Sequence, residues 1–234
     1  MPKRSTVLRR VPVPARVEQT LDAALDKAIA VQRPMVLAYL DRVRTKQPHM
    51  TPAELTEQLE RRYRAAVMAI GGASGAAAAV PGAGTAASLA SGAAEITAFV
   101  SASAMYVLAL AELHGVPVSD PQIRRALVLS VLVGEGGAAV VAGEGVERVH
   151  WAKALGRGAS KDRISVINSR LGRMLLTRYG TRQGALLLGR ALPLGVGAGV
   201  GAVGNVALAR ATIKSARKAF GPAPRRFPPR VVEA

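Results

Sequence analysis

The chain of 234 residues contains no cysteine, and aromatic residues make up only 3% of it. The absence of cysteine excludes a disulfide scaffold and a zinc site with thiolate ligands. Half of the residues are apolar, mostly Ala, Val and Leu, and 24 glycines accompany them. A core of small side chains gains less energy per residue than one of large side chains. Small residues do let helix backbones approach closely, as they do in membranes.

Acidic residues are also scarce, since 15 Asp and Glu face 32 Lys and Arg, for a net charge of +17. The basic excess lies in three blocks. Residues 1–16 carry five basic groups and no acid, residues 152–183 carry eight against Asp162, and residues 205–234 carry seven against Glu233. Such blocks are typical of proteins that face lipid headgroups or nucleic acid. A solvated basic surface is the alternative.

No stretch alternates like a β-strand, and the apolar periodicity predicts an all-α bundle of about eight helices built from Gly/Ala-rich hairpins. We expect three parts. Residues 1–16 form a basic disordered arm with no apolar run of signal-peptide length, residues 17–220 a single helical domain, and residues 221–234 a disordered tail rich in Pro and Arg.

The first helices are predicted from their stripes and caps. One helix covers Val17–Gln32, and a second begins at Pro34. A third begins at Thr51, because Thr51 can cap it, Pro52 fits the first turn and Glu54 completes a capping box. Its predicted inner face carries Leu55, Leu59, Tyr63, Ala66 and Ile70. Its predicted outer face carries Glu57, Glu60, Arg61, Arg62 and Arg64.

Residues 65–94 carry no charge, and the Pro-Gly sequence at 81–84 predicts a turn that makes them a helical hairpin. The second arm runs from Thr85 to His114. Later helices are expected to begin at Asp120-Pro121, to break near residues 134–137, and to form a basic helix from Lys161 to Tyr179 that ends at Gly180.

Three stretches approach the length of a membrane span, which is about 20 apolar residues. They are residues 65–80, 96–111 and 191–209. Each is short or interrupted, and Ala and Gly insert weakly. The hairpins are therefore expected to insert shallowly, to span with tilt, or to form the core of a soluble bundle. We favour a membrane-associated protein with weakly hydrophobic hairpins.

Glycines recur at spacings of four, which places them on one helix face and creates a flat groove for a second helix. A phosphate-binding loop is the weaker interpretation, because no Walker lysine and no strand accompanies them. The glycines concerned are Gly71, Gly75, Gly195, Gly197, Gly199 and Gly201.

Four charged residues, Glu95, Glu135, Glu144 and Arg190, lie within apolar sequence. A buried charge needs a partner, so we expect an ion pair between Arg190 and one of the carboxylates. A carboxylate site for a metal or a proton is the alternative. No histidine lies at ligand spacing, no catalytic motif is present, and no metal or cofactor is expected. An enzyme that uses Glu95 or Glu135 stays a further alternative.

The last helix is predicted to be amphipathic and basic. Arg210, Lys214, Arg217 and Lys218 border its apolar stripe. Such a helix suits an anionic lipid surface, and an ordinary surface helix is the alternative. Nucleic acid is the second candidate partner, although few aromatic residues are available for stacking on bases.

Two blocks of sequence, residues 71–132 and 192–220, resemble the EcsC family of bacterial helical proteins. In that family a Gly/Ala-rich hairpin leads through an acidic position, here Glu95, to a long helix that ends at a His-Gly turn. The C-terminal block is similar to the family's segment with a turn, an asparagine, here Asn205, and a basic end. The resemblance implies an all-α protein linked to transport or secretion, in the cytoplasm, at the cytoplasmic face of the inner membrane or inserted in it. It implies membrane proteins as partners and no established catalytic activity. A homo-oligomer is a further expectation, if the glycine faces meet between copies.

Overall fold

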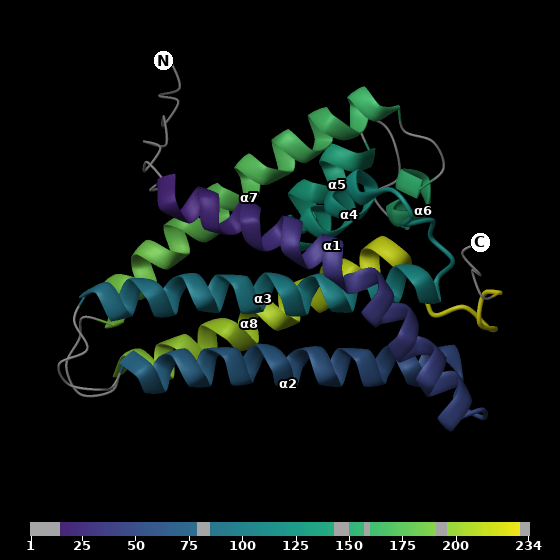
Figure 1. Cartoon of the computed structure of the whole chain (residues 1–234), viewed down its shortest axis with the longest axis horizontal. Helices are drawn as coiled ribbons and strands as arrows, with labels where there is room; N and C mark the ends of the chain where they lie inside the picture. Colours follow the sequence, from purple (N-terminus) through teal and green to yellow (C-terminus); the bar gives the residue numbers. More distant parts are fainter. Residues whose placement is uncertain (1–14, 79–84, 143–149, 157–159, 191–195, 230–234) are drawn as a thin grey trace, which may run out of the picture.

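The computed structural model describes residues 15–78, 85–142, 150–156, 160–190 and 196–229. Within these ranges the chain forms helices and no strand, which confirms the all-α prediction (Figure 1). The helices are α1 (Ala15–Lys46), α2 (Pro52–Ala78), α3 (Thr85–Leu113), α4 (Pro121–Val133), α5 (Glu135–Ala142), α6 (Trp151–Gly156), α7 (Lys161–Arg190) and α8 (Val196–Phe220).

The helices begin where side chains satisfy their first amide groups. At the start of α2 the Glu54 carboxylate accepts hydrogen bonds from the Thr51 amide (2.7 Å) and hydroxyl (2.9 Å). The Glu54 amide donates back to the Thr51 hydroxyl at 3.3 Å, as a capping box requires. The Thr51 amide lowers the pKa of Glu54 below its ordinary value. At the start of α4 the Asp120 carboxylate accepts from the Gln122 amide at 2.6 Å.

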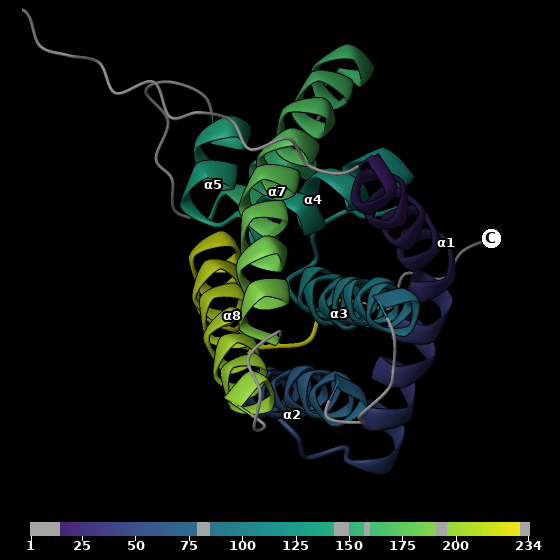
Figure 2. The ribbon, with the colours of Figure 1, turned by 90° about the vertical axis from the view of Figure 1, so that its left-hand side faces the viewer.

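Helix α3 lies at the centre of the molecule. It packs against α1 and α2, and α8 packs against α2 (Figure 2). Helices α4 and α7 form a second layer, in which the Asn168 amide donates to the Gln122 backbone carbonyl at 3.1 Å. Among the described residues, Ala94–Leu113 is the one segment long and apolar enough to cross a membrane, and 61% of its most apolar window is buried inside the fold.

Two predicted helix boundaries are wrong. Helix α1 is continuous through Pro34, where the sequence predicts a break. Pro34 is exposed, and the buried residues Ile29 and Val36 continue one core-facing stripe across it. Helix α7 likewise continues past Gly180 to Arg190, since a glycine within a helix costs only about 1 kcal/mol relative to alanine.

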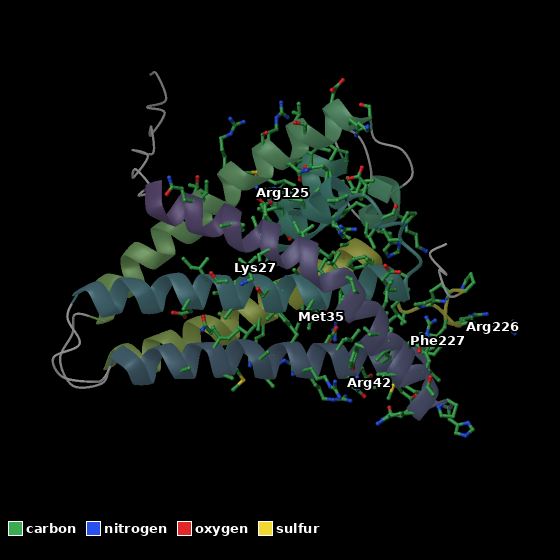
Figure 3. All side chains as sticks on the ribbon, in the orientation of Figure 1. Lys27, Met35, Arg42, Arg125, Arg226 and Phe227 are labelled. Atoms are coloured by element: carbon green, nitrogen blue, oxygen red, sulfur yellow. The ribbon has the colours of Figure 1, made fainter. Side chains whose placement is uncertain are left out.

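Residues 221–229, within the segment predicted as a disordered tail, follow α8 without forming a helix. Gly221 turns the chain at φ +79° after α8. Phe227 then lies beside the C-terminal part of α1, where the Arg44 guanidinium is 4.7 Å from the centre of its ring (Figure 3). Phe227 is half-buried against the core. Cation–π and apolar contacts hold a segment whose composition alone indicates disorder.

Candidate functional site

Helices α2 and α8 run antiparallel and are joined at two levels by side chains. At one level Arg217 of α8 donates to the carboxylate of Glu60 of α2 through Nε (2.7 Å) and Nη2 (2.6 Å). At the other level Asn205 of α8 lies against Gly71 of α2. These two contacts fix the register that places the basic residues of α8 beside α2.

A shallow groove of about 460 Å³ opens along this pair. We call it the basic groove. Its lining contains one apolar side chain and five cations, and no aromatic or acidic side chain. The lining residues are Arg64 of α2 and Arg210, Ile213, Lys214, Arg217 and Lys218 of α8.

Two of the five cations have carboxylate partners. Arg217 pairs with the buried Glu60, and Lys218 donates to Glu135 at 2.7 Å. The Glu60 hydrogen bond and charge raise the pKa of Arg217 above its ordinary value.

The other three cations of the groove are exposed, and the part of the chain that the structure describes gives them no carboxylate partner. They are Arg64, Arg210 and Lys214. The groove therefore holds three positive charges that are available to an external anion.

A buried polar cluster supports the floor of this region. Glu60 is only 4% exposed, although the sequence predicts it on the outer face of its helix. Ser103 donates to the Phe99 carbonyl at 2.7 Å, so Tyr63 donates its hydroxyl proton to Ser103 at 2.9 Å. Tyr106 stacks on Tyr63 with 4.7 Å between ring centres. Burial, and then the Glu60 charge, raise the pKa of Tyr106, so its phenol stays neutral.

Glu95 and Asn205, the two positions that the family resemblance singles out, lie together. The Asn205 amide donates to the Glu95 carboxylate at 3.3 Å. The same amide occupies the space of a side chain at Gly71, since a Cβ there would lie 2.2 Å from Asn205 Nδ2. Gly71 thus admits Asn205 between α2 and α3, where it reaches Glu95.

Glu135 does not lie in an apolar interior. Its side chain is 79% exposed, and it accepts a hydrogen bond from Lys218. The chain turns at Gly134, with φ +81°, so that Glu135 begins a new helix on the surface. The predicted partner Arg190 lies outside the residues whose side chains are described, and so does Glu144.

The other predicted packing glycines are placed only in part. Gly71 is buried against α8, as described above. Nothing is described of Gly195, nor of the surroundings of the remaining four, which lie within helical backbone. These four are Gly75, Gly197, Gly199 and Gly201.

The described ranges offer few groupings of side chains besides the charged ones from which a function could be inferred. No three His, Asp or Glu side chains are grouped there as metal ligands would be. Comparison with known proteins found no matching family model, no matching curated protein and no matching solved structure. The basic groove and the polar cluster beneath it are therefore the features from which a function is inferred.

One half-buried histidine, His114, predicts a pH dependence of stability. His114 lies against Phe220, with ring centres 5.3 Å apart, and its Nδ1 is 2.8 Å from the Leu110 carbonyl. Burial lowers the pKa of His114. The unfolded chain then binds a proton at higher pH than the folded chain does. The stability should fall as the pH drops below about 6.5 towards the lower, folded pKa.

The melting temperature between pH 8 and pH 5 measures this dependence. His114→Phe should make the loss below pH 6.5 smaller, whereas His49→Gln, at an exposed position, should leave it unchanged. An equal acid loss in the wild type and in His114→Phe would show that His114 is not the group responsible.

Proposed function

We propose that the protein is a non-enzymatic helical protein that associates with an anionic membrane surface through the basic groove. The observation that carries this proposal is the convergence of Arg64 with Arg210 and Lys214, from helices far apart in sequence, with no carboxylate partner among the residues that the structure describes. Each basic residue held near an anionic bilayer contributes about 1 kcal/mol of binding. Membership of the EcsC family, and a place at the cytoplasmic face of a bacterial inner membrane, belong to the same proposal.

The lining of the groove favours lipid over nucleic acid. Its one uncharged side chain is Ile213, and no aromatic ring lies among the cations to stack on a base. The exposed surface next to Arg64 on α2 carries Met68, which is 49% exposed. An apolar side chain beside a cluster of cations suits a lipid surface, where headgroups and acyl chains lie close together.

Association at the surface is favoured over a membrane span. In the described ranges, the one segment apolar enough to span, Ala94–Leu113, is mostly buried among the other helices. Inserting this segment of α3 into lipid would require α1 and α2 to separate from it. Binding through the basic groove leaves the core packed.

Vesicle flotation tests the proposal. Vesicles with anionic phosphatidylglycerol should bind the protein, and vesicles of phosphatidylcholine alone should not. The double variant Arg210→Ala with Lys214→Ala should bind roughly thirty-fold more weakly, because two contributions of about 1 kcal/mol are lost. Raised salt should also weaken binding of the wild type.

A matched control keeps the net charge equal. Arg163→Ala with Arg170→Ala removes two exposed arginines from the half of α7 that packs against α4, and it should bind like the wild type. Equal loss in both double variants would assign the binding to overall charge and contradict a role for the groove. Binding to a DNA fragment but to neither kind of vesicle would replace lipid with nucleic acid.

A further inference from the structure

Beyond Arg64 the exposed face of α2 changes from charged to neutral. Arg61 and Arg64 are followed, at helical spacing, by exposed positions that carry no charge and no side-chain hydrogen-bonding group. We call these positions the neutral stripe. They are Ala65, Met68, Ala69, Gly72 and Ala73. A solvent-facing stripe of a soluble helix normally carries polar side chains.

The polar groups of this region point inward. Opposite the neutral stripe, Gly71 contacts Asn205, and Asn205 donates to Glu95. The backbone amides of α2 are hydrogen-bonded within the helix. The outer side of this part of α2 therefore presents no group that needs water, which is the condition for contact with lipid.

The neutral stripe is continuous with the basic groove. Arg64 lines the groove and directly precedes Ala65, the first residue of the stripe. From Arg64 the neutral stripe extends along α2 to Ala73, a length of about 14 Å. Cations at one end and a neutral face beyond them form the pattern of a helix that lies in a bilayer surface.

We propose that the neutral stripe of α2 inserts into the boundary between the headgroups and acyl chains of an anionic bilayer, while the basic groove binds the headgroups. This inference rests on the proposed function and adds how the protein is held. Charge complementarity selects the bilayer as the occupant, because the three groove cations that have no carboxylate partner in the described ranges lie where the neutral face begins. Insertion of such helices is about 5–10 Å deep.

The absence of cysteine makes a direct test possible, because a single introduced cysteine is the only site of labelling. Among the residues whose side chains the structure describes, three large apolar side chains are about half exposed. They are Met35 at 51%, Met68 at 49% and Val166 at 53%. Met68 lies on the neutral stripe. Met35 lies on α1, across α3 from α8, and Val166 lies on α7 (Figure 2, Figure 3).

The full chain with Met68→Cys, Ala73→Cys, Met35→Cys or Val166→Cys is labelled with an environment-sensitive fluorophore and mixed with phosphatidylglycerol vesicles. The labels at positions 68 and 73 should shift to shorter emission wavelength and be quenched by nitroxide lipids. The labels at positions 35 and 166 should do neither. Met68→Asp, at an exposed position, should weaken flotation about tenfold and leave the melting temperature unchanged.

The possible failures are distinguishable. If flotation shows salt-sensitive binding and the labels at 68 and 73 do not respond, insertion is wrong and the proposed function stands. A response at all four positions would mean that the whole chain opens on the vesicle, and it would also overturn insertion by this stripe. No binding to anionic vesicles would overturn both proposals.

Discussion

Replacing Arg217 with alanine should lower the free energy of unfolding by about 3 kcal/mol. Arg217 makes two hydrogen bonds to Glu60, whose side chain is only 5% exposed. Without the guanidinium the Glu60 carboxylate stays buried beside the phenol of Tyr106 and loses the cation that is hydrogen-bonded to it. This loss is at the lower end of the range for breaking a buried ion pair. Arg217 itself is 66% exposed, so water can replace part of its interaction with Glu60. Urea denaturation followed by circular dichroism measures the change.

Lys218→Ala is the matched control for this prediction. Lys218 is the next residue and pairs with Glu135, but both side chains are largely exposed. Its removal should cost less than about 1 kcal/mol. The double variant Glu60→Gln with Arg217→Ala should be more stable than Arg217→Ala, because the neutral amide removes the buried charge. A cost for Arg217→Ala no larger than that for Lys218→Ala would show that Glu60 is solvated.

The starts of α2 and α4 could be predicted from the sequence because the interactions that form them are local. The Thr51–Glu54 pair spans three residues, and Asp120 caps a helix that begins at the next residue. Periodicity also separates the strongly buried face of each helix from its exposed face. These signals need no knowledge of what packs against the helix, so the all-α class and most helices follow from them.

The burial of Glu60 could not be predicted in this way. A helix with one neighbour buries one narrow stripe, and Glu60 lies at the edge of the stripe that contains Leu59 and Tyr63. Helix α2 has two neighbours, α3 and α8, so a wider face is buried and Glu60 falls within it. The partner that compensates its charge, Arg217, is 157 residues away in sequence.

Only part of the candidate site could be predicted from the sequence, for the same reason. The four basic residues of α8 form a local pattern at helical spacing, and the sequence indicates them. Arg64 joins them only through the antiparallel register of α2 and α8, which the contacts of Gly71 and Arg217 set. Glu135 is the opposite case to Glu60, because it is predicted in an apolar interior and lies exposed. Apolar neighbours in sequence suggest burial, but the turn at Gly134 places Glu135 at the surface.

Replacing Gly71 with alanine should lower the free energy of unfolding by about 2–3 kcal/mol. The added Cβ would lie 2.2 Å from Nδ2, 2.9 Å from Cγ and 3.2 Å from Cβ of Asn205. A rotation of the Asn205 side chain would move Nδ2 and Cγ away but leave its Cβ at 3.2 Å, which is still a tight contact. Helices α2 and α8 must therefore separate, or Asn205 must leave Glu95. Thermal and urea denaturation measure the loss.

Gly72→Ala separates this packing effect from helix propensity. No atom lies within 4 Å of a Cβ at Gly72, so alanine there should be neutral or stabilise α2 by up to about 1 kcal/mol. If both variants behave alike, α8 does not lie against Gly71.

Asn205→Ala adds a second comparison. Gly71→Ala should cost less in that background than in the wild type, because the side chain that it strikes is gone. If Gly71→Ala costs as much stability in the Asn205→Ala background as in the wild type, the loss comes from contact with the backbone of α8. The small residue at position 71 would then be required for the close approach of the helices rather than for the Asn205–Glu95 hydrogen bond.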